Sequence, residues 1–512
     1  MKKLPIGIQT FAKIREDDFV YIDKTDIALK LIQSGGGYFF LSRPRRFGKS
    51  LFLSTLKSIF RAEKDLFKGL YIYDKYDWRI SYPVIHISFG AGGYQSVSAL
   101  NQNIKDIVRY NEDALKIKCG EKDGPETNFI DLIKKSFDTY KQKVVILIDE
   151  YDKPILDNID NSEMSGILRE HLKNFYSVIK ENDEFIKFTF ITGVSKFSKV
   201  SLFSGLNNLN DITIASDYAT ICGYTQKDIE DHFSDRLKNV DRNALQQWYN
   251  GYSWLGDPVY NSFGFLCFLF NNCVFENYWF STATPTFLIK LIKKRYYHVP
   301  NLEKIVMDKK MLESFDTDKI ELETIMWQSG YLTIKDVIRN IRGSRYILSF
   351  PNNEVRMGFN DHIIDLLARP KTNHLITQDN IFDALYNEDM KKLETSIKSL
   401  FASITYHNFT KNEIDRYEGF YASVIYAYLA SLGMEVYAED TTNRGRIDLT
   451  LRYDSITAIF EFKVDHQGAM KQLKEMRYHE KYMADSRSLT LIAIEFSSKE
   501  RNIVNFEWQK IK

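Results

Sequence analysis

The stretch YFFLSRPRRFGKS, residues 38–50, decides the fold of the N-terminal part of this chain. Its first four residues are apolar or aromatic and predict a buried strand, and the apolar stretch 51–60 that follows predicts a helix. A strand, a basic loop, a lysine next to a hydroxyl residue, and a helix are, in this order, the parts of a phosphate-binding loop. The stretch therefore predicts that nucleotide phosphates bind at the start of this helix.

The residue types of the loop each have a chemical reason. Gly48 lets the backbone approach a phosphate closely, Lys49 reaches the terminal phosphates, and Ser50 offers a hydroxyl to Mg²⁺. The predicted nucleotide-binding residues are Arg43, Pro44, Arg45, Arg46, Phe47, Gly48, Lys49 and Ser50. The usual pattern GxxxxGK[ST] begins with glycine, but Arg43 occupies that place. The crowded cations repel one another unless a polyphosphate neutralises them, and the alternative is a basic turn before an ordinary helix.

A second motif supports the loop. Residues 144–148, VVILI, predict a fully buried parallel strand that ends in Asp149 and Glu150. Ligands of parallel sheets bind at the carboxyl ends of the strands. We therefore predict that Asp149 holds Mg²⁺ through water and that Glu150 orients or deprotonates the attacking water during hydrolysis of ATP.

Hydroxyl side chains end another predicted strand, 188–194. Thr192 or Ser195 is a candidate sensor of the terminal phosphate of ATP. Polar capping of the strand explains these hydroxyls at least as well, so the assignment stays open at this point.

The length and the pattern predict the domain organisation. A chain of 512 residues exceeds what one hydrophobic core usually serves, so two or three domains are expected. Apolar runs at 38–41, 84–89, 144–148 and 188–194 alternate with helical patterns, which predicts an α/β fold with a parallel sheet. We predict a P-loop NTPase domain at 1–215, a mixed, mostly helical lid or spacer at 216–384, and a small α/β domain at 385–512.

The C-terminal domain carries a group of carboxylates. Residues 412–433 predict a helix whose apolar face also contains Glu418, and a buried charge needs a partner or a metal. Strands are predicted at 445–451 and 458–464. If a two-residue turn at Asp454 and Ser455 joins them, Asp448 lies opposite Glu461, and Arg446 lies opposite Lys463.

Like charges that face each other across a sheet are destabilising, so this pattern favours a functional site over a structural one. Asp448 and Glu461 are predicted to bind Mg²⁺, or Mn²⁺, with Glu418 completing the shell. Lys463 would position water or stabilise the charge on a phosphorane. Gln472, on a helix that we expect to carry Tyr478 as well, is a candidate supporting residue. The alternative is an ordinary charged face in contact with solvent.

The composition restricts the function classes. The net charge of +1 gives no polyelectrolyte signature, so any contact with DNA or RNA is expected to be local. The cysteines Cys119, Cys222, Cys267 and Cys273 show no CxxC spacing, which argues against a zinc knuckle and fits a reducing, cytoplasmic setting. No apolar run reaches the ~18 residues of a membrane span, and no signal peptide is expected.

Several motifs together resemble a known family of bacterial proteins. The loop RPRRFGKS, the segment DEYDKP at 149–154, YIDKT at 21–25, FSGLNNL at 203–209 and WYNGY at 248–252 are similar to a predicted AAA-ATPase-like domain. The C-terminal part resembles a PD-(D/E)XK nuclease-like domain, with the restriction-endonuclease-like fold. The resemblance implies ATP binding and assigns Asp448, Glu461 and Lys463 to the D…ExK signature.

Two hypotheses follow. In the first, ATP hydrolysis gates metal-dependent phosphodiester cleavage of DNA or RNA, with Lys49, Glu150, Asp448, Glu461 and Lys463 as catalytic residues. In the second, the protein is a nucleotide switch that recognises protein partners, and the nuclease fold is a binding module that does not cleave. The nuclease requires Glu418, Asp448, Glu461 and Lys463 to converge within metal-sharing distance. The sequence leaves the oligomeric state open, a homo-oligomer included.

Overall fold

The chain forms two compact units in a computed structural model. The structure describes residues 1–120, 124–196, 202, 203, 206, 208–282, 288, 298–313, 321–341, 343–367, 371–404 and 418–512. The first unit comprises Met1–Trp279 and Met307–Ile347, and the second comprises Phe280–Val306 and Leu348–Lys512. The units therefore do not follow the predicted boundaries at 215 and 384, because most of the expected lid or spacer belongs to the first unit.

A parallel sheet lies at the centre of the first unit, as predicted. Its strand order is β2-β3-β4-β1-β5, and each neighbouring pair is parallel. The strands are β1 (Tyr38–Ser42), β2 (Val84–Ser88), β3 (Val144–Asp149), β4 (Ile186–Gly193) and β5 (Asn210–Asp211). Every residue of β3 is buried, which agrees with its continuous apolar run. The carboxyl ends of β1, β3 and β4 thus meet at one edge of the sheet.

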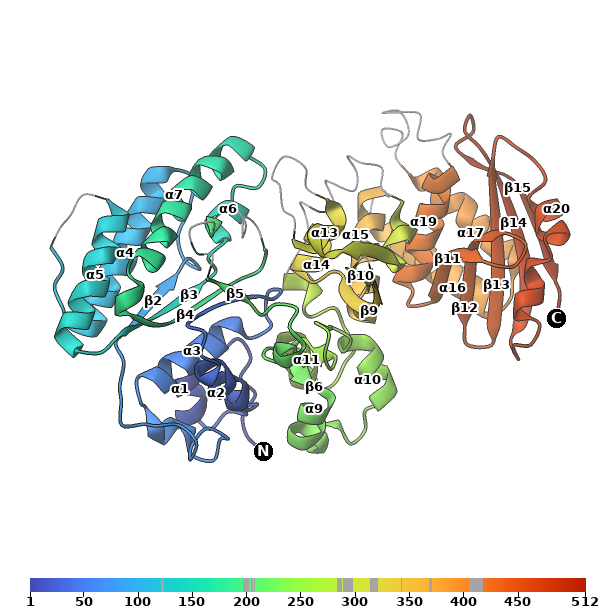
Figure 1. Ribbon diagram of the computed structural model, residues 1–512. Helices are drawn as coiled ribbons and strands as arrows, with labels where there is room; N and C mark the ends of the chain where they lie inside the picture. Colours follow the sequence, from blue (N-terminus) through green and yellow to red (C-terminus); the bar gives the residue numbers. More distant parts are fainter. Residues whose placement is uncertain are drawn as a thin grey trace. The chain divides into compact units, whose positions relative to one another are not determined.

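Helices cover both faces of this sheet (Figure 1). One face carries α4 (Val97–Leu115), α5 (Pro125–Tyr140) and α7 (Ser162–Glu181), and the other carries α1 (Phe11–Glu16), α2 (Thr25–Gln33) and α3 (Lys49–Phe60). Ser96 and Asn161 cap α4 and α7, each through a side-chain oxygen that accepts an N–H of the first turn. This is the covered parallel sheet that the alternating pattern predicts.

Three helices that follow the sheet pack on the N-terminal segment. Val20 and Ile22 share one hydrophobic core with α9 (Gln226–Phe233), α10 (Arg242–Tyr249) and α11 (Ser262–Phe270). Further elements of the first unit are η1 (Lys64–Phe67), α6 (Lys153–Leu156), η2 (Asp183–Phe185), η3 (Ser216–Tyr218), β6 (Tyr224–Thr225), η4 (Ser234–Leu237), β7 (Val259–Tyr260), α13 (Lys309–Glu313) and α14 (Leu322–Ser329). The chain also forms a three-stranded sheet of order β8 (Ile305–Asp308), β10 (Gly343–Ser349), β9 (Thr333–Asn340).

A mixed sheet forms the second unit. Its order is β11-β12-β13-β14-β15, and β13 and β14 are its parallel pair. The strands are β11 (Glu435–Thr441), β12 (Arg446–Tyr453), β13 (Ile456–Val464), β14 (Ser488–Ser497) and β15 (Asn502–Lys510). The prediction of two strands here was incomplete. Three strands were not predicted. The edge strands β11 and β15 carry many exposed charged and polar residues, so they lack the apolar runs by which strands are found, whereas β14 was missed although it is a buried apolar run.

Helices also cover both faces of the second sheet. Phe460 of β13 packs with residues of α16 (Lys371–Tyr386), α17 (Met390–Ser403) and α19 (Glu418–Ser431), whereas its neighbour Ile459 packs with α20 (Ala469–Glu475). Other elements are η5 (Phe280–Thr282), η6 (Val299–Glu303), α15 (Asn353–Leu367) and η8 (Tyr478–Tyr482). Tyr478 therefore lies in a separate short helix, not on the helix of Gln472 as expected. Part of the predicted helix 412–433, including Ile414 and Tyr417, falls outside the described residues.

None of the helices in the described ranges combines the length and the apolar composition that a membrane span needs.

Candidate functional site

The predicted phosphate loop lies between β1 and α3. Gly48 precedes the first helical residue, Lys49, and its φ of 95° falls in the left-handed region that favours glycine. Arg46 also has a positive φ, 65°. Ser50 is the second residue of α3, and the side chains of Arg45 and Arg46 are exposed. The chain thus turns sharply twice before it enters the helix.

Carbonyl oxygens of the loop are bonded from outside. Arg45 O accepts from Trp279 Nε1 at 3.1 Å, Arg46 O accepts from Ser262 Oγ at 3.3 Å, and Phe47 O accepts from the backbone N–H of Gly223 at 3.1 Å. Within the part of the chain that the structure describes, the N–H groups of residues 45–50 have no hydrogen-bond partner. A run of free N–H groups at a helix N-terminus is the arrangement that binds phosphate.

Lys49 is held inside this loop. Its Nζ donates to the carbonyl oxygens of Arg43 at 3.0 Å and Pro44 at 2.9 Å. Burial lowers the pKa of Lys49, and the negative charge of Asp149 counters this effect. The ammonium is thus placed between the loop and the acidic end of β3.

Arg43 differs from the other arginines of the loop. Its guanidinium is buried, donates to the carbonyl oxygens of Thr213 at 2.8 Å and Tyr218 at 3.1 Å, and lies 4.1 Å from the ring centroid of Trp254. These contacts fasten the start of the loop to the segment after β5. Arg43, which stands in place of the first glycine of the pattern, is therefore bonded to protein carbonyls. Fewer arginine side chains than predicted are left to face a phosphate.

Two carboxylates meet this loop at the end of β3. Asp149 is buried, and its Oδ1 accepts the N–H of Glu150 at 3.0 Å. Glu150 adopts a positive φ of 52°, a strained conformation for a non-glycine residue. Burial raises the pKa of Glu150, as does the nearby charge of Asp149, whereas Lys49 lowers it. The structure therefore brings Lys49, Asp149 and Glu150 together, as the two sequence motifs require.

The two candidate phosphate sensors are bonded within the protein. Thr192 Oγ1 donates to Leu41 O at 2.9 Å, and Ser195 Oγ donates to Asp152 Oδ2 at 2.6 Å. Both side chains are buried. Position 193, between these two residues, has no room for a side chain, because a Cβ there would come within 2.4 Å of Asp152 Oδ1. These contacts favour polar capping of β4 over sensing.

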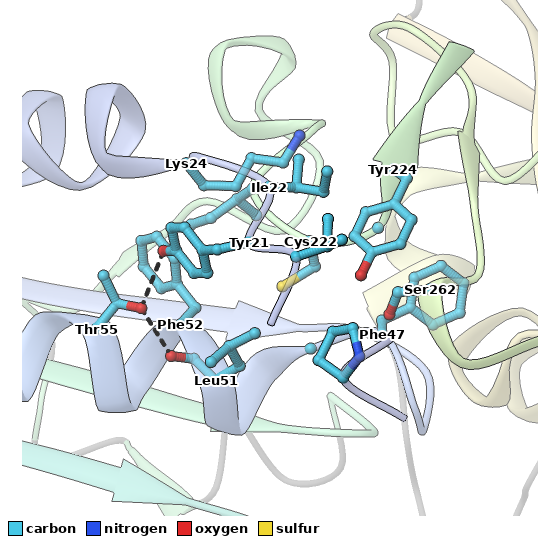
Figure 2. A pocket seen from close by; sticks show the side chains of 15 residues that line it. Tyr21, Ile22, Lys24, Phe47, Leu51, Phe52, Thr55, Cys222, Tyr224 and Ser262 are labelled. Atoms are coloured by element: carbon cyan, nitrogen blue, oxygen red, sulfur yellow. Dashed lines mark hydrogen bonds between the residues drawn. The ribbon is translucent and has the colours of Figure 1, made fainter. Parts of the chain in front are cut away.

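Figure 2 shows a pocket beside the start of α3. Inside it, Tyr21 and Thr55 share a hydrogen bond of 3.1 Å. Lys24 contributes from the same N-terminal segment and pairs with Asp228 at 2.7 Å. The lining residues are Pro5, Val20, Tyr21, Ile22, Lys24, Phe47, Gly48, Leu51, Phe52, Thr55, Ile221, Cys222, Gly223, Tyr224 and Ser262. The pocket thus has largely apolar and aromatic walls and opens next to the phosphate loop.

A second candidate site lies in the second unit. The hairpin β12–β13 turns at Asp454 and Ser455 with the predicted register, confirmed from Tyr453–Ile456 to Leu449–Phe460. The ladder ends there, and Asp448 Oδ2 instead accepts the N–H of Phe462 at 2.8 Å. The other neighbour of β12 is β11, and the pairing between these two strands skips Asp448 and Glu439. Glu439 has a φ of 51°. Interrupted pairing of this kind often re-aims a side chain at an active site.

Glu461 is the centre of this site. Its Oε1 accepts from Lys463 Nζ at 3.1 Å and from the side-chain amide of Gln472. Its Oε2 is buried and has no hydrogen-bond partner within the described residues. Arg446 was predicted to face Lys463 across the hairpin. In the structure Arg446 forms an ion pair with Glu439 at 3.1 Å, and Lys463 forms one with Glu461 at 3.1 Å. Each cation therefore has a carboxylate partner, and neither needs a bound phosphate to balance its charge.

The electrostatics indicate a strained pair of carboxylates. Burial raises the pKa of Glu461, and the charge of Asp448 raises it further. Burial also raises the pKa of Asp448, and Glu418 adds to this effect. An unsatisfied, buried carboxylate oxygen beside a second carboxylate is a hard oxygen donor set, which fits Mg²⁺ or Mn²⁺.

The predicted cluster of three carboxylates is not assembled. No group of three or more His, Cys, Asp or Glu side chains that could hold a metal ion is present where the structure describes the chain. Glu418, the first residue of α19, acts on Asp448 and Glu461 through its charge. The structure therefore supplies Asp448, Glu461 and Lys463 as neighbours, and the charge of Glu418 acts on all three.

The folds and sites of the two units define an ATPase-like P-loop unit joined to a nuclease-type sheet unit. Residues 5–203 match the family model "Predicted AAA-ATPase", and residues 416–506 match the "PD-(D/E)XK nuclease superfamily". The chain belongs to the family of AAA-ATPase-like proteins with a C-terminal PD-(D/E)XK nuclease superfamily domain.

The relationship to one relative extends over nearly the whole chain. This relative is a protein of Azotobacter chroococcum mcd 1 described as "Uncharacterized protein in vnfD 5'region". The two are 45% identical over 511 residues, which cover 99% of this chain and 98% of that protein. No solved structure matches the chain.

Sequence reasoning missed several residues around the first site. Tyr21 and Lys24, which line the pocket, lie in the YIDKT segment, so the family resemblance was a signal for them. Nothing in the local sequence marked Trp279, Ser262 or Gly223 as partners of the loop, because these contacts join segments far apart in the chain.

We expect Arg43→Gly, which restores the glycine of the usual loop pattern, to destabilise the protein. The substitution leaves the carbonyls of Thr213 and Tyr218 without their donor, at a cost of about 2–4 kcal/mol. Urea denaturation of the first unit measures this loss. Arg45→Gly is the matched control, since the Arg45 side chain is exposed, and it should leave the midpoint nearly unchanged. Equal midpoints for both variants would contradict the structural role of Arg43.

We expect Glu461→Gln to change how stability depends on pH when a chelator is present. Because folding raises the pKa of Glu461, the folded state binds the proton more tightly, so stability falls as the pH rises from about 5 to about 8. The glutamine variant should lose part of this fall, and Mg²⁺ should stabilise the wild type more than the variant. The control is Glu475→Gln, whose side chain is 64% exposed. Parallel pH profiles for all three proteins would contradict the buried-pair interpretation.

Proposed function

We propose that the first unit binds and hydrolyses ATP. The observation that carries this proposal is the loop at residues 45–50, whose carbonyl oxygens are bonded from outside while its N–H groups are free. Free N–H groups and a lysine together bind phosphate oxygens without base specificity. In this proposal, phosphate replaces the carbonyls of Arg43 and Pro44 as the partner of the Lys49 ammonium.

The acidic residues supply the hydrolytic part. Ser50 and Asp149 would hold Mg²⁺, which neutralises charge on the phosphates when it is bound. Glu150 orients the attacking water and accepts its proton. Its raised pKa suits this role, because a general base works best when its pKa approaches the working pH.

We propose that the pocket of Figure 2 accommodates the base of ATP. It begins at Gly48 and continues along Leu51 and Thr55 on α3, so a nucleotide whose phosphates bind the loop reaches it directly. Its aromatic walls suit a flat ring, and the hydroxyl groups of Tyr21 and Thr55 offer polar contacts at one side.

We propose that the second unit cleaves phosphodiester bonds of DNA or RNA. The convergence of four residues expected from the sequence is not met, because Glu418 is not grouped with Asp448 and Glu461 at a metal position within the described residues. The proposal therefore uses two protein carboxylates: Asp448 and Glu461 would hold Mg²⁺ or Mn²⁺, which would activate water and stabilise developing charge, and water and substrate phosphate would fill the remaining positions. Lys463 stabilises the negative charge that develops on the oxygens of the phosphate being attacked. The free Oε2 of Glu461 supports this assignment.

A second candidate function is a nucleotide switch whose nuclease fold binds a partner without cleaving it. It is favoured by one observation: within the described residues, three carboxylates do not gather at a metal position. We further propose that the protein works in the cytoplasm, to which its free cysteines are suited, and that a homo-oligomer is compatible with this function.

We expect Lys49→Ala to abolish ATP binding and Glu150→Gln to bind ATP but hydrolyse it about 100-fold more slowly or worse. The first change removes the cation of the loop, and the second removes the base but keeps its shape. Equilibrium binding of a fluorescent ATP analogue and phosphate release measure the two effects. Arg61→Ala, outside the loop, is the control. Unchanged binding and turnover in both variants would refute the ATPase assignment.

We expect plasmid DNA to be cleaved by the wild type with Mg²⁺ or Mn²⁺, and not by an Asp448→Ala, Glu461→Ala double variant. The reaction is followed on gels with and without ATP, and an RNA substrate is run in parallel. Dependence of cleavage on ATP would establish coupling between the units. Intact nucleic acid under every condition, with ATP still bound, would favour the switch.

A further inference from the structure

The pocket beside the phosphate loop extends along α3 within the first unit (Figure 2). It begins at Gly48, where the phosphates of the proposed nucleotide bind. About two helical turns farther along α3 it reaches Thr55, which faces Tyr21 of the N-terminal segment. The end of the pocket at Thr55 is therefore the end that lies farthest from the phosphates.

A short chain of hydrogen bonds closes this end of the pocket. Thr55 Oγ1 donates to Leu51 O at 3.0 Å, and it lies 3.1 Å from the hydroxyl oxygen of Tyr21. A carbonyl oxygen only accepts, so the single hydroxyl proton of Thr55 is committed to Leu51 O. The Tyr21 hydroxyl then donates its own proton to Thr55. The oxygen of Tyr21 is left with lone pairs alone, and it presents a hydrogen-bond acceptor to a ligand in the pocket.

The surroundings hold the Tyr21 hydroxyl in this arrangement. Its ring packs edge to face on Phe11, with centroids 5.0 Å apart, and Thr55 is buried. Burial raises the pKa of Tyr21, so the phenol keeps its proton at neutral pH. Lys24, a cation of the pocket wall, pairs with Asp228 at 2.7 Å. Figure 2 shows the amine of Lys24 directed away from Tyr21 and Thr55, so this donor does not reverse the polarity of the Thr55 end.

The position of the phosphates decides which edge of a purine meets Tyr21. The substituent on carbon 6 of a purine lies at the far end of the ring system from the nitrogen that carries the sugar. A nucleotide whose phosphates bind at Gly48 and whose base lies along α3 turns this substituent toward Tyr21 and Thr55. In adenine the substituent is an amino group, which donates, whereas in guanine and hypoxanthine it is an oxygen, which accepts.

We propose that Tyr21, with its proton held by Thr55, selects adenine over 6-oxo purines at the proposed nucleotide site. This inference rests on the proposed binding of ATP in this pocket, and it adds the residues that determine the specificity for the base. The oxygen of Tyr21 accepts a hydrogen bond from the 6-amino group. A 6-oxo group at the same place brings two acceptors together with no proton between them, which leaves both unsatisfied in a water-poor pocket.

The test compares ADP with inosine diphosphate on the full chain in the presence of Mg²⁺. The two ligands share their ribose and phosphates, but inosine diphosphate has an oxygen in place of the 6-amino group. Isothermal titration calorimetry measures both affinities. We expect the wild type to bind ADP about 10- to 100-fold more tightly than inosine diphosphate.

Two substitutions separate the roles of the two hydroxyl groups. Tyr21→Phe keeps the ring against Phe11 but removes the acceptor, so ADP should bind about 10-fold more weakly while inosine diphosphate binds about as before. Thr55→Val frees the proton of Tyr21, which can then donate to a 6-oxo group. In this variant inosine diphosphate should bind about 10-fold more tightly than to the wild type, with little change for ADP. The matched control is Tyr82→Phe, whose ring packs on Phe60 outside the pocket and which should keep the wild-type ratio.

Each contrary result has its own meaning. Equal affinities of the wild type for the two diphosphates would overturn the selection of adenine. A wild-type ratio that persists in Tyr21→Phe would overturn the role of Tyr21, and this variant decides the question even if Thr55→Val does not fold. Unchanged binding of inosine diphosphate to a folded Thr55→Val would overturn the assignment of the proton. A wild type that binds neither ligand would overturn the proposed nucleotide site, and this inference with it.

Discussion

Hydrogen bonds to the carbonyl oxygens of the phosphate loop are the interactions on which the first site depends. A backbone has donors and acceptors on opposite sides of each peptide, so a loop that turns its N–H groups inward must find partners for its carbonyls outside. Here Trp279, Ser262 and Gly223 provide them. The proposed anion-binding surface is therefore supported by residues of the region that was predicted to be a lid or spacer.

In the carboxylate site of the second unit, by contrast, polar groups are left partly unsatisfied. Its charges are held together although they repel, and burial increases the cost. Only Oε1 of Glu461 is compensated within the described residues, by Lys463 and Gln472, while Oε2 stays without a partner. A bound cation would remove this unfavourable electrostatic free energy, which explains why such a pair occurs at a ligand site. The hairpin also loses backbone pairing at this site, because the pairing between β12 and β13 ends at Leu449 and does not include Asp448.

Local patterns were sufficient to predict most of the strands and helices that carry the candidate site residues. Strands β1 and β3 are continuous apolar runs, and the turn at Asp454 fixed the register of the hairpin. The edge strands β11 and β15 were missed because exposed strands need no apolar run, but β14 was missed although its apolar run at 489–496 marks a buried strand. The role of Arg43 could not be found, since its partners at Thr213, Tyr218 and Trp254 lie far along the chain. The position of Glu418 depends on how α19 packs, which a helical period alone does not determine.

The order in which the chain builds its units affects how the protein is made. The first unit takes its final segment, Met307–Ile347, from beyond the point where the chain has already entered the second. On the ribosome, the core around β1 to β4 can therefore form early, but Gly330 cannot close on Pro44 until that later segment has emerged. Until then the loop at residues 43–50 lacks part of its support, so a nascent chain passes through a stage in which the sheet is complete and the proposed nucleotide site is not.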